Sequence, residues 1–148
     1  MFALSLKQLK PLFLDRRPIM DRTDRWWRRA AMRVGGYLRR AARSQIRRRK
    51  RISKPGQGPT SWTGLLKRNI FFAYDPRRRT VVVGPAALNK ATDAPHLLEF
   101  GGRTSLEQEV DGRRVRRLAY YRPRPYMKPA LEKTRKKIPS LLRQAAAR

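Results

Sequence analysis

Residues 94–102 read APHLLEFGG and residues 120–131 read YYRPRPYMKPAL, and the fold is expected to be organised around these two motifs. The first motif predicts a short apolar strand from His96 to Phe100, ended by Gly101 and Gly102. The second begins with alternating arginines and prolines at residues 122–125. It predicts extended backbone, because a proline disfavours helix at the residue before it. The chain then enters its last helix.

The polar segment between the two motifs predicts a β-hairpin. Its strands run over Leu106–Val110 and Arg113–Tyr121, and Asp111-Gly112 is a favoured two-residue turn. Closing this turn brings oppositely charged residues together on one face. The predicted pairs are Val110 with Arg113, Glu109 with Arg114, and Glu107 with Arg116. We interpret these charges as part of the fold.

Two long helices are predicted, one before the predicted strands in the sequence and one after them. The first runs from Asp21 to Arg51, with apolar residues at steps of three and four and capping oxygens on Asp21, Thr23 and Asp24. Gly35-Gly36 in its middle indicates a kink or a close contact. The second runs from about Met127 to Ala147. Pro129 suits its first turn, and Pro139 should bend or divide it.

Residues 65–74 and 80–83 predict another β-hairpin, with a basic tip at Arg77-Arg78-Arg79. Before it, residues 53–64 (SKPGQGPTSWTG) predict a loop. Its Trp62 is either folded back on the core or an exposed anchor, and we prefer the first reading. Residues 1–20 are expected to be an arm, with apolar alternation at Phe2, Leu4 and Leu6. The expected fold is a single α+β domain over residues 1–148, in which a long N-terminal helix and a C-terminal helix pack on a small antiparallel β-sheet.

The charge is extreme, with 38 Lys and Arg residues against 10 Asp and Glu residues, a net charge of +28. The excess is spread along the chain: residues 1–60 hold 18 basic and three acidic side chains. Such a field attracts polyanions, and it also keeps subunits apart at low salt. There is no cysteine, which excludes disulfides and thiolate-bound zinc. We see neither a signal-peptide pattern nor a transmembrane stretch, so a soluble protein is expected, without membrane contact.

No catalytic apparatus is recognisable. His96 is the single histidine, and Glu99 stands three residues later. On the predicted strand these two side chains face opposite sides, which argues against a shared metal. Glu99 is expected to pair with one of the many arginines, in its own chain or across a subunit boundary. No phosphate-binding loop pattern is present. We therefore expect no enzyme, with no catalytic residue, metal or cofactor.

The order of motifs resembles the neck proteins of long-tailed bacteriophages, the tail-component or tail-completion family of phages, prophages and gene transfer agents. The similarity covers nearly the whole chain: GGYLRRAARSQIRRR (35–49), SKPGQGPTSWTGLLKRNIFFAYD (53–75), TVVVGP (80–85), APHLLEFGG (94–102) and YRPRPYMKPALEK (121–133). Its most specific parts are LEFGG (98–102) and RPYMKPAL (124–131).

The resemblance implies an α+β subunit that assembles with copies of itself into a ring, most often a hexamer. Such rings sit in the virion between the capsid portal and the tail tube, and they contact head-completion, tail-terminator or tail-tube proteins. The unusually strong positive charge departs from the family pattern. It leaves open how much of the surface meets other subunits and how much meets DNA in the lumen. Assembly would take place in the host cytoplasm.

We therefore predict a structural virion protein of the head–tail connector. The alternative is a small basic nucleic-acid-binding protein, ribosome-associated or nucleoid-associated, and a third hypothesis is a small nuclease. Candidate subunit-interface residues are Trp62, Glu99, Phe100, Gly101, Gly102 and Tyr126. Candidate contacts to DNA or to an acidic partner are Arg47, Arg48, Arg49, Lys50, Arg51, Arg77, Arg78 and Arg79.

Overall fold

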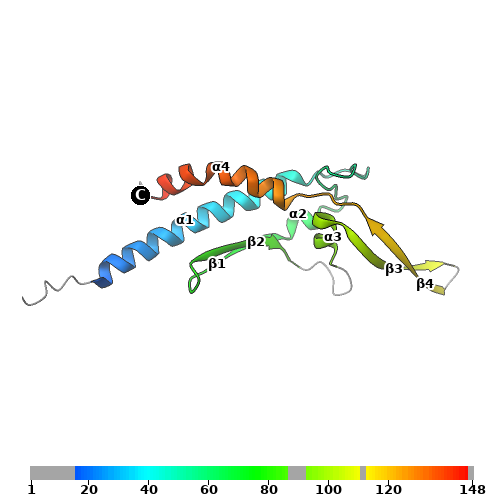
Figure 1. Ribbon diagram of the computed structural model, residues 1–148, viewed down its shortest axis with the longest axis horizontal. Helices are drawn as coiled ribbons and strands as arrows, with labels where there is room; N and C mark the ends of the chain where they lie inside the picture. The colour runs from blue at the N-terminus through cyan, green and yellow to red at the C-terminus, as the bar shows by residue number, and fades with distance from the viewer. Residues whose placement is uncertain (1–15, 87–92, 111–112, 147–148) are drawn as a thin grey trace, which may run out of the picture.

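The computed structural model describes residues 16–86, 93–110 and 113–146 and confirms a mixed α+β fold (Figure 1). Residues 2–14, which carry the apolar alternation of the predicted arm, lie outside the described residues. The elements in chain order are α1 (Arg16–Gln45), α2 (Leu65–Arg68), β1 (Ile70–Asp75), β2 (Thr80–Pro85), α3 (Ala94–Phe100), β3 (Gly102–Val110), β4 (Arg113–Tyr121) and α4 (Met127–Ala146).

The two long helices, α1 and α4, lie side by side and run in opposite directions (Figure 1). The core sits between the last turns of α1, the first turns of α4 and the start of β1. Small side chains on both helices let them approach closely. The core cluster consists of Ala41, Ala42, Ile46, Leu66, Ile70, Tyr126 and Ala130.

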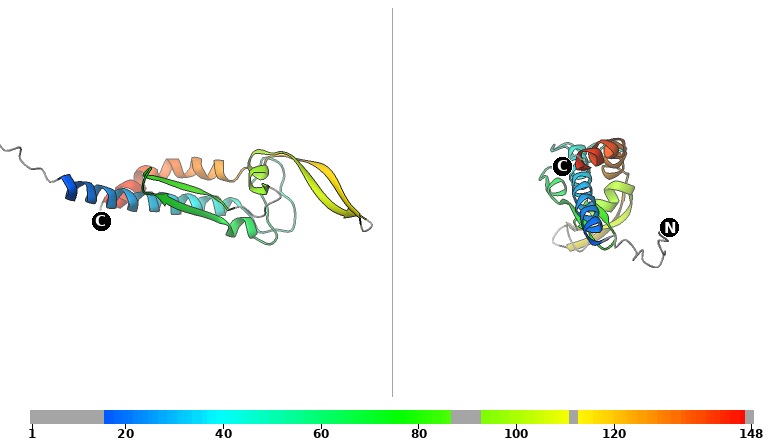
Figure 2. Two further views of the ribbon diagram at one scale, coloured as in Figure 1. Left: turned by 90° about the horizontal axis from the view of Figure 1, so that it is seen from below. Right: turned by 90° about the vertical axis from the view of Figure 1, so that its left-hand side faces the viewer.

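Both predicted hairpins are present, as two separate two-stranded sheets rather than one small sheet. In the first, β1 pairs with β2, and Phe72 lies opposite Val83. In the second, β3 pairs with β4 in the register that the sequence predicted, with Val110 opposite Arg113 and Glu107 opposite Arg116. Figure 2 shows the β1–β2 hairpin lying along α1, whereas the β3–β4 hairpin projects from the end of the body.

The first helix differs from its prediction at both ends. It already includes Arg16, so residues 16–20 of the predicted arm are helical, and Pro18 fits the first turn. Asp24 is therefore no cap and instead forms an ion pair with Arg79 at 2.9 Å. The helix ends at Gln45, before the basic run, because the chain turns there into a loop that pairs Arg47 with Thr60.

The double glycine in α1 is a site of close packing, as one of the two predicted alternatives had it. A Cβ atom at Gly35 would lie 2.7 Å from both Phe72 Cδ2 and Val81 Cγ2. The β1–β2 hairpin can therefore approach the helix only where the side chain is missing. Gly36 has more space around it, since a Cβ atom added there would have Phe72 Cζ as its nearest neighbour, at 4.0 Å.

The predicted strand at residues 96–100 is wrong, because α3 is a short helix from Ala94 to Phe100. Asp93 caps it by accepting a hydrogen bond from the His96 N–H, and Pro95 occupies the first turn. Gly101 ends it with a φ of 75°, in the left-handed region that favours glycine. Each of these signals was present in the sequence.

The last helix begins at Met127, as predicted. Pro129 lies in the first turn of α4, and the helix continues through Pro139 without being divided. In the described ranges, no helix combines the length and the apolar character that crossing a bilayer requires.

Candidate functional site

Glu99 stabilises the start of α4 within its own chain. One carboxylate oxygen, Oε2, accepts hydrogen bonds from the backbone N–H groups of Tyr126 and Met127, at 2.8 and 2.9 Å. The other, Oε1, accepts one from the Lys128 N–H at 2.8 Å. An arginine was expected as the partner of this carboxylate. The structure instead places the carboxylate at the positive end of a helix dipole, with both oxygens occupied.

The neighbouring interface candidates divide into buried and exposed residues. Tyr126 is 1% exposed and belongs to the core, so its ring is no surface anchor. Burial raises the pKa of its phenol, and the carboxylates of Glu99 and Asp93 add to the rise. Gly101 packs against the Tyr121 carbonyl, where a Cβ would come within 2.8 Å. Phe100 is exposed and remains available to a neighbour, and its ring lies 4.8 Å from that of His96.

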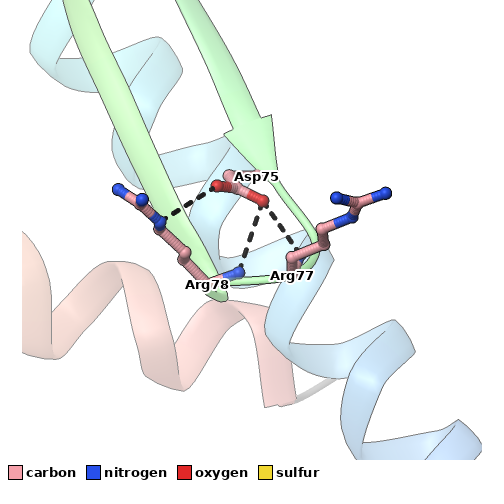
Figure 3. Close-up of polar contacts among 3 residues, drawn as sticks. All are labelled: Asp75, Arg77 and Arg78. Carbon is pink, nitrogen blue, oxygen red and sulfur yellow. Dashed lines mark hydrogen bonds and ion pairs between the residues drawn. The ribbon is translucent and has the colours of Figure 1, made fainter.

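At the tip of the β1–β2 hairpin, the backbone N–H groups of Arg77 and Arg78 bond to Asp75, and Arg79 is the arginine whose side chain forms a close ion pair. Asp75 Oδ1 accepts hydrogen bonds from the N–H groups of Arg77 and Arg78, at 2.9 and 3.3 Å (Figure 3). Asp75 Oδ2 lies 4.0 Å from Arg78 Nε. Arg79 pairs with Asp24, and its carbonyl accepts a hydrogen bond from Trp27 Nε1 at 2.7 Å. The Asp75 contacts shape the turn itself, and the two contacts of Arg79 fasten the tip to α1.

The basic run at residues 47–51 lies in the loop that follows α1, and not in the last turn of the helix, where the sequence analysis had placed it. The loop closes on itself through the pairing of Arg47 with Thr60. Gly58 fits against the end of the helix, where a Cβ would lie 2.4 Å from the Gln45 carbonyl oxygen. The loop is thus tied to the helix by specific contacts.

Trp62 is 67% exposed, which overturns our preference for a residue folded back on the core. Its ring lies 5.4 Å from Lys50 Nζ, and its carbonyl accepts a hydrogen bond from Arg48 Nε at 3.4 Å. The indole is therefore close to one cation, Lys50, and open to solvent. Of the predicted anchors, Trp62 keeps the surface position that an interface needs.

The β3–β4 hairpin presents apolar side chains that the sequence analysis did not single out. Leu118 and Tyr120 are 85% and 70% exposed and lie two residues apart, hence on one face of β4. Arg116 is also on this face and pairs with Glu107 at 3.5 Å, as predicted. The Glu109 side chain, in the second predicted pair, lies outside the described part. Leu118 and Tyr120, two positions apart in the predicted strand, were the signal for this surface.

The segment at residues 122–126 connects the three regions described above. Arg124 donates from its N–H to the Leu98 carbonyl at 2.7 Å and from Nε to the Ser53 carbonyl at 3.1 Å. The Pro123 carbonyl accepts a hydrogen bond from the Gly56 N–H at 3.0 Å. The second motif thus holds α3, the basic loop and α4 together.

The residues with described side chains form no group of three or more histidines, aspartates or glutamates close enough to hold a metal ion. Although His96 and Glu99 do fall on a helix, the Glu99 carboxylate is already engaged by α4. In comparisons with protein-family models, curated proteins and solved structures, no match to this chain was found.

Proposed function

We propose that this chain is a structural subunit of the neck of a tailed bacteriophage or a related particle. In this proposal it acts without catalysis, by assembling with copies of itself into a ring between capsid and tail. The projecting β3–β4 hairpin is the observation that supports this most directly. It extends from the body, pairs with no other described strand, and exposes Leu118 and Tyr120.

An isolated two-stranded hairpin is marginally stable in water, and its unpaired edges recruit other strands. A hairpin that reaches out from each subunit can therefore gain stability by packing on a neighbour. When each copy offers its hairpin to the next copy, the contact is head-to-tail and closes into a ring if the rotation permits. Exposed Phe100, two residues before β3, supplies further apolar surface at the root of the hairpin. Trp62 is a second exposed aromatic residue.

The charge sets a condition on this assembly. At +28 per chain, subunits repel one another, so salt or an acidic neighbouring ring is expected to promote the ring. The small core also supports assembly. Few large side chains are buried inside the single chain, so several large apolar side chains remain exposed for contacts with other subunits.

Mass measurement and electron microscopy of the purified chain, at about 50 to 500 mM salt, test the proposal. A closed ring that appears with rising salt, or on addition of head or tail components, supports it. Purified particles that lack this chain at the capsid–tail junction contradict it. A chain that stays monomeric under all these conditions and binds RNA tightly favours the alternative of a nucleic-acid-binding protein.

A further inference from the structure

The loop over residues 46–61 has a defined shape because its two ends are hydrogen-bonded to each other. The Arg47 N–H donates to the Pro59 carbonyl at 3.2 Å, and the Ser61 N–H donates to the Arg47 carbonyl at 3.0 Å. Farther along, the Thr60 hydroxyl donates to the Arg51 carbonyl at 2.9 Å. Pro59 is fully buried. The side chains on this loop are thus presented by a fixed backbone.

The five consecutive cations of this loop divide between two sides. Arg48 and Lys50 point towards Trp62, one to its carbonyl and the other to its ring. The odd-numbered residues line a depression of about 670 Å³ on the other side of the segment, namely Arg47, Arg49 and Arg51. The even-numbered and the odd-numbered cations of the run therefore have different neighbours.

The remaining lining of the depression is polar except for Ile52 and Gly58, and it contains no carboxylate. Lys54 adds a fourth cation, and the other polar groups are hydroxyls and amides: Ser44, Ser53, Thr60, Gln45 and Gln57. Ser53 Oγ is shielded from solvent and has no hydrogen-bond partner among the described residues.

The positive charge of the depression is not neutralised within the described chain. None of its four cations forms an ion pair there, whereas Arg78 and Arg79 of the hairpin tip pair with Asp75 and Asp24. The C-terminal end of α1 contributes a partial negative charge of about half an elementary charge. Four full positive charges outweigh it, so the depression favours an anion.

We propose that this depression binds phosphate groups, and that its ligand is the phosphodiester backbone of a nucleic acid. Arginine forks match phosphate oxygens in bidentate geometry, and hydroxyls and amides donate to the oxygens that remain. A nucleic-acid strand repeats its charge at every nucleotide, which suits the depression because three of its cations, Arg47, Arg49 and Arg51, repeat at every second residue. The site belongs to the single chain and does not depend on ring formation.

Two charge-matched double variants within the basic run test this assignment. Arg49→Gln with Arg51→Gln removes two cations from the depression, whereas Arg48→Gln with Lys50→Gln removes two from the Trp62 side. Binding of the whole chain to a DNA duplex is measured against salt concentration. The first variant is expected to reduce the slope of log affinity against log salt by about 2, about 1 for each lost phosphate contact. The second is expected to leave the slope close to that of the wild type.

An equal reduction of the slope in the two variants would mean a diffuse basic surface and would overturn the site. An unchanged slope in the first variant would overturn it as well. Thermal unfolding of both variants checks that the loop and core are intact. Competition experiments then test whether the site prefers phosphate to carboxylate. Polyphosphate should displace the DNA at a far lower concentration of negative charges than polyglutamate does. Displacement at equal concentrations would overturn the phosphate assignment. Mass measurement on the same samples separates this site from the ring. A monomer that binds DNA through the odd-numbered arginines supports the site and counts against the ring.

Discussion

Glu99 and Tyr126, 27 positions apart in the sequence, meet in a hydrogen bond of 2.8 Å between the Glu99 carboxylate and the Tyr126 backbone N–H. Two further N–H groups of the first turn of α4 bond to the same carboxylate. The residues just before α4 are extended and include Pro125, so no local side chain supplies this cap. A residue of α3 does so instead, and thereby fixes where the last helix begins.

Replacement of Glu99 by alanine is expected to lower the free energy of unfolding by about 1–3 kcal/mol, because three N–H groups at a helix start lose a charged acceptor. Glu99→Gln keeps one acceptor oxygen and should lose less. Chemical denaturation measures both. Glu132→Ala, at an exposed position of α4, is the control and should stay within about 0.5 kcal/mol of the wild type. An equal loss in the control would argue against the capping role.

The error at residues 96–100 explains why this contact was not foreseen. Leu97, Leu98 and Phe100 suggested a strand, whereas Asp93, Pro95 and Gly101 gave start and stop signals for a helix. The short apolar run fits either structure, and the capping residues should have decided. The partner of Glu99 could not be found in the same way, because it depends on how the chain returns after the β3–β4 hairpin.

The close approach at Gly35 gives a second prediction. Gly35→Val should destabilise the chain by about 1–3 kcal/mol, since Phe72 and Val81 would have to move away from α1. Gly36→Ala has room and should stabilise the helix by up to about 1 kcal/mol. The two adjacent variants are compared by thermal unfolding. If both changed stability in the same direction and by the same amount, the packing at Gly35 would not be the cause.

The buried phenol of Tyr126 gives a prediction for alkaline pH. In the folded chain its pKa lies well above the ordinary value of about 10, whereas the unfolded chain ionises near that value. Above about pH 10 the unfolded state therefore binds fewer protons than the folded state, and the free energy of unfolding falls as pH rises. Tyr126→Phe should show a smaller fall between about pH 9 and 11 in denaturation experiments. Identical pH profiles for the two proteins would contradict this.

The basic run shows another limit of sequence reasoning. Residues 47–51 follow a long amphipathic pattern, and cations suit a helix C-terminus, so continuing the helix was the natural prediction. The helix instead stops where Gly58 meets the Gln45 carbonyl and Arg47 pairs with Thr60. These partners lie 13 residues along the chain in both cases. The hairpin registers were predictable because the turn and both strands are contiguous in the sequence.

The exposed face of the β3–β4 hairpin gives the last prediction, which bears on the proposed ring. Leu118→Ala removes an apolar side chain that is almost fully exposed in the single chain, so the free energy of unfolding should change by less than about 0.5 kcal/mol. If the hairpin packs on a neighbouring subunit, the same change should weaken subunit association about tenfold, equivalent to about 1.4 kcal/mol. Leu131→Ala, at an exposed leucine on α4, is the matched control. Mass measurement over a range of chain concentrations gives both dissociation constants, and equal weakening by the two variants would remove the hairpin from the interface.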